Sequence, residues 1–374
     1  SGMSTDDLDR LADELETGRL PPARAADLDA WLRVAVERDA SDLLLLAGEP
    51  PTLRIDGVIV RCEGPVLDGV DVEEMVRPAL PPYALRRYEA DGIADASRRV
   101  AGLGRFRLNL HRERGRAAAA IRRLPARVPR IETLDLPEGV ERLSRLPNGL
   151  VIIGGATGSG KTTTMAALVE TINRRDARHV VTVEDPIEYE HLNQRSVIQQ
   201  MEVGVDAPDF PSALRSVLRQ APDVIVIGEM RDPETMRMAL AAGETGHLVL
   251  TTLHTTDVAS TIARLTDSFP PERQPTIRQE IAAALTAVFV QTLLPRQGGG
   301  RVPAAELLMV SYGARQHIRR NALQHLHQEI TITRKHGSFT LEESLASLVK
   351  RGVVSTADAA IRAHHPGDFE QALL

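Results

Sequence analysis

The chain has 374 residues, of which 43% are apolar and 26% charged, a composition typical of a globular protein with a sizeable core and two or three domains. A net charge of −6 and an aromatic content of only 3% disfavour a nucleic-acid-binding protein, which usually needs a basic surface and aromatic rings for base stacking. The single cysteine, Cys62, excludes an internal disulfide and a cysteine-ligated zinc site.

Residues 28–125 show the mixed pattern of a small α/β domain, preceded by an acidic, proline-interrupted lead-in over residues 1–27 that we expect to form at most one short helix. Apolar spacing predicts the following helices and strands: helices at 29–39 and 72–80, and strands at 42–46, 52–60, 106–110 and 117–123. Asp56-Gly57 indicates a hairpin within 52–60. Residues 126–148 contain several prolines and few periodic apolar positions, which is typical of a linker.

The stretch 155–162 fits the phosphate-binding pattern G-x-x-x-x-G-K-[ST], between an apolar run and a helical segment. Its glycines allow backbone N–H groups to converge on phosphate oxygens at a helix N-terminus. Lys161, one of only three lysines among 45 basic residues, supplies a compact charge, and Thr162 supplies a hydroxyl for Mg²⁺. We therefore expect a nucleoside triphosphate here. The expected nucleotide-binding residues are Gly155, Ala156, Thr157, Gly158, Ser159, Gly160, Lys161, Thr162 and Thr163.

Four apolar runs rich in β-branched residues alternate with helical segments in residues 149–374. These runs are 150–154, 180–184, 224–228 and 248–254. The alternation predicts an open, mostly parallel sheet with helices on both faces, and a ligand beyond the carboxyl ends of its strands.

Carboxylates follow two of these runs. Glu184, Asp185 and Glu188 end one run, where they are either solvated acids with a helix cap or part of the nucleotide site. Glu229 ends another run, in the arrangement of a Walker B element that binds Mg²⁺.

Two histidines, His247 and His254, flank the 248–253 strand at opposite ends. Strand-end histidines are often structural, and no third ligand is evident for a zinc site. We count both histidines among the expected nucleotide-binding residues, as parts of a polar relay between the nucleotide and a subunit interface.

Several arginines lie near the end of the small domain. They are Arg105, Arg107, Arg112, Arg114, Arg116, Arg122 and Arg123. This is either a solvated basic stretch or a source of arginine fingers, which accelerate phosphoryl transfer by about 10³–10⁵. Among them, we predict Arg107 and Arg122 as the candidate arginine fingers.

Residues 281–294 form the longest apolar segment, but Thr286 and Gln291 interrupt it and it is shorter than the roughly 18 residues of a membrane span. We interpret it as a buried helix. Together with the lack of a signal-peptide pattern, this predicts a cytoplasmic protein without a transmembrane segment. Near the C-terminus, 340–343 is a capping box for a helix that ends near Gly352, and 355–358 starts a last short helix.

In order, these motifs resemble the type II/IV secretion ATPase superfamily and, within it, the type IV pilus retraction (PilT-like) ATPases. The matching segments are 40–43, 50–57, 105–109, the 155–162 loop, the acidic box ending at Glu188, 228–232, the histidine box 245–254 and 293–296. The resemblance implies an N-terminal PAS-like α+β domain, a RecA-like P-loop NTPase domain with a C-terminal helical extension, and a homohexamer.

The same resemblance implies ATP hydrolysis with Mg²⁺, with Glu188 as catalytic base and Glu229 as Walker B acid. It also implies a PilC-like platform protein as partner, at the cytoplasmic face of the inner membrane, and retraction of a type IV pilus.

The chain departs from the family pattern at several positions. Leu44 replaces a usual histidine, Gln220-Ala221 replaces an acidic pair, and 313–320 matches the retraction-associated segment only loosely. The paired CxxC zinc knuckle of extension and type II secretion ATPases is absent, which favours retraction. An accessory retraction motor, an extension or secretion motor and, more distantly, a ring-shaped nucleic-acid translocase remain as alternatives.

Overall fold

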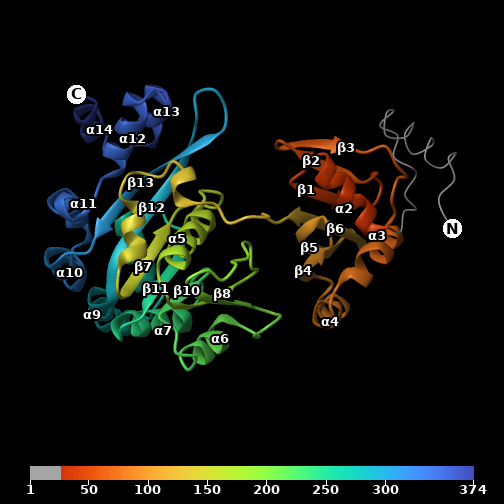
Figure 1. Ribbon diagram of the computed structural model, residues 1–374, viewed down its shortest axis with the longest axis horizontal. Coiled ribbons are helices and arrows are strands. Elements are labelled where there is room, and N and C mark those ends of the chain that lie inside the picture. The colour runs from red at the N-terminus through yellow and green to blue at the C-terminus, as the bar shows by residue number, and fades with distance from the viewer. Residues whose placement is uncertain (1–26) are drawn as a thin grey trace. The chain divides into compact units, whose positions relative to one another are not determined.

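The computed structural model describes residues 27–374, so the lead-in over residues 1–26 with its expected short helix lies outside the described residues. The chain divides into two compact units, Ser1–Ala126 and Arg127–Leu374 (Figure 1). Each unit contains its own hydrophobic core.

Over residues 27–126, the first unit consists of a six-stranded antiparallel sheet and three α-helices. The strand order is β3-β2-β1-β6-β5-β4. The strands are β1 (Asp42–Leu45), β2 (Thr52–Ile55), β3 (Val58–Arg61), β4 (Ala94–Val100), β5 (Gly104–Glu113) and β6 (Arg116–Arg123), and the helices are α2 (Leu28–Glu37), α3 (Gly69–Val76) and α4 (Pro82–Asp91).

The predicted hairpin joins β2 to β3, and both residues of its turn have positive φ, 50° at Asp56 and 80° at Gly57. That is the geometry of a two-residue turn that matches the twist of the strands. Helix α4 and strand β4 were not predicted from the sequence. Local signals for α4 were present, because Pro82 occupies its first turn and Gly92 ends it with φ of 75°.

The second unit is built on a seven-stranded sheet in the order β13-β12-β7-β11-β10-β8-β9, in which β13 alone pairs antiparallel. The strands are β7 (Gly149–Gly154), β8 (His179–Glu184), β9 (Val197–Glu202), β10 (Val224–Ile227), β11 (Leu248–Leu253), β12 (Leu285–Pro295) and β13 (Arg301–Met309). The four predicted parallel strands are confirmed as β7, β8, β10 and β11.

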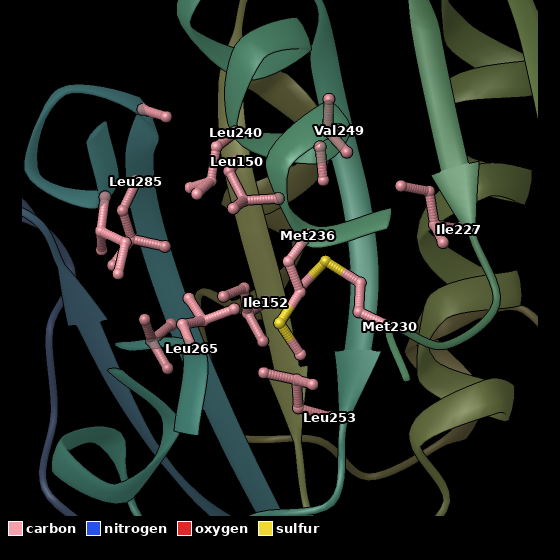
Figure 2. Close-up of a cluster of buried hydrophobic side chains, with 14 of the residues drawn as sticks. Leu150, Ile152, Ile227, Met230, Met236, Leu240, Val249, Leu253, Leu265 and Leu285 are labelled. Atoms are coloured by element: carbon pink, nitrogen blue, oxygen red, sulfur yellow. The ribbon is translucent and has the colours of Figure 1, made fainter. Parts of the chain in front are cut away.

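Helices cover both faces of this sheet. They are α5 (Lys161–Arg175), α6 (Phe210–Val217), α7 (Pro233–Glu244), α8 (Val258–Asp267), α9 (Gln274–Ala284), α10 (Tyr312–Arg319), α11 (Leu326–Ile332), α12 (Leu341–Lys350), α13 (Thr356–Arg362) and α14 (Pro366–Leu373). Because side chains alternate along a strand, Leu150 and Ile152 of β7 pack toward α7, α8 and α9 (Figure 2). Val151 and Ile153 pack toward α5. The predicted fold class is confirmed.

Residues 126–148, interpreted from sequence as a linker, contribute to the core of the second unit. Two short 3₁₀ helices, Ile131–Thr133 and Val140–Arg145, bury Ile131, Val140 and Leu143 beside α5 and β7. Prolines ended the local periodicity, so the sequence did not reveal this packing. The linker interpretation is therefore wrong for most of the segment.

The apolar segment 281–294 is not one buried helix. Helix α9 ends at Ala284, and the next residue begins β12, which pairs parallel with β7 and antiparallel with β13. Both a buried helix and a buried central strand are apolar on all sides, so periodicity could not separate them.

The C-terminal extension begins with α12, whose predicted capping box between Thr340 and Glu343 is present. Ser355 caps α13 as expected, and α14 is an additional helix that the sequence analysis missed. Among residues 27–374, no helix is long and apolar enough to span a bilayer.

Glu306 of β13 is a buried carboxyl group beneath the first turn of α8. One of its oxygens accepts a hydrogen bond of 2.7 Å from the backbone N–H of Val258, and burial raises its pKa from 4.5 to about 8. Asp257 and Glu342 lie near enough to raise it further. The folded chain therefore holds a proton here that the unfolded chain releases at lower pH.

The free energy of unfolding, measured over a series of pH values, is expected to reveal the raised pKa of Glu306. Since the folded pKa lies above the unfolded one, Glu306 favours folding fully below pH 4.5 and loses about 1.4 kcal/mol of that contribution per pH unit until about pH 8. Glu306→Gln cannot ionise but can still accept from Val258. The free energy of unfolding of this variant, relative to that of the wild type, should therefore increase with pH across this window. If the two free energies changed in parallel with pH, the raised pKa of Glu306 would be contradicted.

Candidate nucleotide site

The glycine-rich loop joins β7 to α5, and α5 begins at Lys161, directly after Gly160. Gly160 has φ of 89°, and a Cβ atom on Gly155 would lie 2.3 Å from the Ser159 Oγ and 2.7 Å from the Gln291 carbonyl oxygen. Only glycine therefore permits this curled backbone at both positions. The loop encloses Ser159, whose Oγ is buried and has no hydrogen-bond partner among the described residues.

Lys161 is buried with only 7% of its surface exposed. Its Nζ donates to the carbonyl oxygens of Gly155, at 2.8 Å, and Ala156, at 3.0 Å. Burial lowers its pKa, and the negative charge of Glu229 opposes that effect. The lysine is thus held inside its own loop as a charge available to a nearby anion.

His254 lies between Lys161 and the Walker B acid. Its Nδ1 is 3.2 Å from the Lys161 Nζ, and its Nε2 is 2.8 Å from Glu229 Oε1. Because an ammonium group only donates, Nδ1 accepts and Nε2 carries the hydrogen that Glu229 accepts. Arg231 donates from Nε to the other Glu229 oxygen at 2.8 Å. The ends of β10 and β11 are thereby connected to the phosphate-binding loop.

Gln291 of β12 is a site residue that the sequence analysis missed. It is buried, its Nε2 donates to the Ser159 carbonyl oxygen at 2.5 Å, and its Oε1 accepts from the Thr164 hydroxyl at 2.6 Å. One amide thus bonds both the loop and the first turn of α5. The available signal was a polar residue interrupting an apolar run, which the analysis assigned to a helix.

Gln291→Met is expected to destabilise the protein by about 1–3 kcal/mol and to raise the KM for ATP. Methionine fills a similar volume but leaves the Ser159 carbonyl oxygen and the Thr164 hydroxyl unpaired in a buried position. Urea unfolding and steady-state ATPase kinetics measure both effects, with exposed Gln324→Met as the matched control. A Gln291 variant that behaves like this control would show that the amide does not support the loop.

The acidic segment after β8 contacts the first turn of α5 through Tyr189. The Tyr189 hydroxyl and the Thr163 Oγ1 are 2.9 Å apart, and burial raises the pKa of Tyr189. Glu188 is partly buried and lies near enough to raise that pKa as well. Glu184 instead accepts from Thr182 at 2.7 Å. Glu188 is thus next to a residue that contacts the first turn of α5, while Asp185 Oδ2 lies 4.0 Å from Arg231 Nη1.

The residues present fit a nucleotide with Mg²⁺. The loop ends in a helix N-terminus with a buried lysine, and the buried Ser159 Oγ has no partner among the described residues. Thr162, in the first turn of α5, and Glu229 provide the oxygen ligands that Mg²⁺ prefers.

His247 lies at the other end of β11 from the loop. Its Nδ1 is 3.2 Å from the Ala242 carbonyl oxygen, and its own carbonyl accepts from the N–H of Gly149, where β7 begins. Because β7 and β11 run parallel, the start of β7 is a full strand away from the loop. The geometry of the second unit therefore does not place His247 with the expected nucleotide-binding residues, and a structural role fits its contacts.

Arg107 and Arg122 are cross-strand partners on β5 and β6 of the first unit. Both side chains are exposed, and Arg122 donates from Nε to Asp42 Oδ1 at 3.0 Å. Arg54 approaches the other Asp42 oxygen at 3.5 Å. The two candidate fingers thus share one basic surface of the first unit.

The model of the family described as "Type II/IV secretion system protein" matches residues 132–328. The chain belongs to this family. It is 39% identical over 343 residues to the type IV pilus retraction ATPase PilT of Pseudomonas aeruginosa, which covers 92% of this chain and 100% of PilT. It is 34% identical to the type IV pilus ATPase PilU of the same organism, over 92% of this chain and 90% of PilU.

A solved structure described as the pilus retraction motor PilT with bound ADP has the same fold as the present chain. The TM-score is 0.85 at 39% identity, covering 92% of this chain and 99% of that one. The resemblance drawn from the sequence motifs, to PilT-like members of the type II/IV secretion ATPases, is confirmed.

Proposed function

We propose that this protein is an ATPase motor that drives retraction of type IV pili. The observation that carries the proposal is the buried Lys161 in the phosphate-binding loop, connected through His254 to Glu229. The match to the retraction ATPase PilT supports it, because it extends over 100% of that protein.

In the proposed mechanism, Lys161 and the N–H groups of the loop bind the phosphates of ATP. Thr162 and Glu229 would hold Mg²⁺, which would supply positive charge where negative charge develops on the transferred phosphoryl group. Glu188 orients or deprotonates the attacking water. Arg107 and Arg122 act as arginine fingers that neutralise the charge developing on the triphosphate.

His254 provides a second link to the reaction. A phosphate that attracts the Lys161 ammonium competes with the Gly155 and Ala156 carbonyls and with His254 Nδ1. His254 also donates to Glu229. A change in the contact between Lys161 and His254 would therefore directly alter the hydrogen bonding of the Walker B acid. These two contacts support the proposal that His254 acts as a relay from the nucleotide.

The proposed assembly is a homohexamer, peripheral to the cytoplasmic face of the inner membrane, that turns a PilC-like platform protein and binds no nucleic acid. Loss of the γ-phosphate removes the negative charge that binds the finger arginines. Its loss would let the two units rotate relative to each other.

A deletion strain tests the direction of the motor. We expect excess surface pili and no twitching motility, with both phenotypes reversed by the wild-type gene and not by Lys161→Ala. A strain without pili would instead identify an extension motor, and twitching that persists with less force would identify an accessory motor. ATPase activity stimulated by added DNA would favour a nucleic-acid translocase.

A further inference from the structure

Three side chains near the C-terminus gather away from the nucleotide site. His327 lies on α11, while His365 and Asp368 lie at the start of α14. Within residues 27–374, they form the one group of three His, Cys, Asp or Glu side chains whose ligand atoms all lie within 4.8 Å of one another. None of them belongs to the motifs that carry the family resemblance.

The spacing of this cluster suits a metal ion. The His327 Nε2 is 2.9 Å from Asp368 Oδ2. Two ligands at about 2.0–2.2 Å from one ion and about 90–110° apart lie roughly 2.8–3.6 Å from each other. This nitrogen and this oxygen are therefore already at the separation of adjacent ligands.

His365 completes the set after a rotation of its ring. The His327 and His365 rings are stacked, with centroids 3.8 Å apart and planes at 26°, so their nitrogen lone pairs do not yet converge. Both His365 and Asp368 are exposed, and rotation of an exposed imidazole meets little resistance.

Separate cores hold the two helices in place. Leu326 and Ile330 flank His327 and are buried in the core formed with α8 and α9. Phe369 is buried with α12 in a different cluster, and the backbone N–H of His365 donates to Glu342 Oε1 at 2.8 Å. Each helix is positioned by a different core, so an ion bound by the three side chains would link α11 to α14.

We propose that His327, His365 and Asp368 bind a divalent transition metal ion, with Zn²⁺ as the best match, which fastens α14 to α11. Two imidazole nitrogens favour Zn²⁺ and its neighbours in the first transition row over Mg²⁺ or Ca²⁺, which prefer oxygen ligands. Water would occupy the remaining coordination positions, because the site lies at the surface. The inference does not depend on the proposed function.

Calorimetric titration of the metal-free full-length protein with ZnCl₂ tests the site. We expect one tight site per chain that His327→Ala, His365→Ala and Asp368→Asn each weaken by about tenfold or more. His364→Ala removes the adjacent exposed histidine outside the cluster and should bind as the wild type does. Millimolar Mg²⁺ should not displace Zn²⁺. Equal affinity in all four variants, or full displacement by Mg²⁺, would overturn the proposal.

Amide hydrogen exchange in α14 distinguishes this site from adventitious binding, because Zn²⁺ bound elsewhere would not change the exchange rate of this helix. Zn²⁺ should slow amide exchange in residues 366–373 of the wild type and of His364→Ala by about tenfold or more, and should leave exchange in His327→Ala unchanged. Exchange in α14 that is indifferent to Zn²⁺ in the wild type would show that the ion does not fasten this helix.

Discussion

Glu188→Ala is expected to bind ATP nearly as tightly as the wild type and to hydrolyse it about 10²–10⁴-fold more slowly, the usual contribution of a general base. The residue follows β8 in the acidic segment, and its neighbour Tyr189 contacts Thr163 in the first turn of α5. The proposed role of Glu188 is to act on the attacking water and not to hold the phosphates, so binding should survive its removal.

Phosphate release in steady state and binding of a fluorescent ATP analogue separate turnover from affinity for this variant. Glu190→Ala is the matched control, because Glu190 is an exposed acid two residues farther along the same segment. Near-normal hydrolysis by the Glu188 variant would remove this carboxylate from the mechanism, and the base would have to come from another residue.

Lys161→Ala is expected to weaken ATP binding by about ten- to hundredfold, because one hydrogen bond to a charged group contributes about 1.5–3 kcal/mol. The variant also leaves the Gly155 and Ala156 carbonyls and the His254 Nδ1 without their donor. Hydrolysis should fall with binding, since no other lysine lies in the loop.

The chain supplies its own control for this prediction. Lys335 is exposed, so Lys335→Ala changes the net charge equally and should leave ATP affinity unaltered. Lys161→Arg tests shape, because a planar guanidinium does not fit where only 7% of the side chain is exposed. Calorimetry that shows unchanged affinity in Lys161→Ala would contradict the phosphate-loop assignment.

Much of the second unit could be predicted because its signals are local. Four β-branched runs between polar turns became β7, β8, β10 and β11, and the glycine-rich loop followed the first of them. Because these strands are parallel, their carboxyl ends meet at one edge of the sheet, which brings His254 and Glu229 to Lys161. For these four strands, only their order in the sheet was not predicted.

Other features depended on pairing between distant segments. Val290 of β12 pairs with Gly154 of β7, which sets Gln291 beside the loop although 136 residues separate Gly155 from Gln291 in the chain (291 − 155). A glutamine within an apolar run has no local feature that predicts this position. The same limit hid β9 and β13, whose places at the two edges of the sheet follow from their neighbours.

By itself, the amino-acid sequence determined the phosphate-binding loop, the parallel strands that end in acids and histidines, and the helix caps near Thr340 and Ser355, because residue spacing and backbone preference act over a few positions. The tertiary structure alone decided that 281–294 splits into a helix and a strand, that Gln291 supports the loop, and that His327 meets Asp368. Those outcomes depend on which segments pack together, and contacts between residues far apart in the chain leave no local pattern to read.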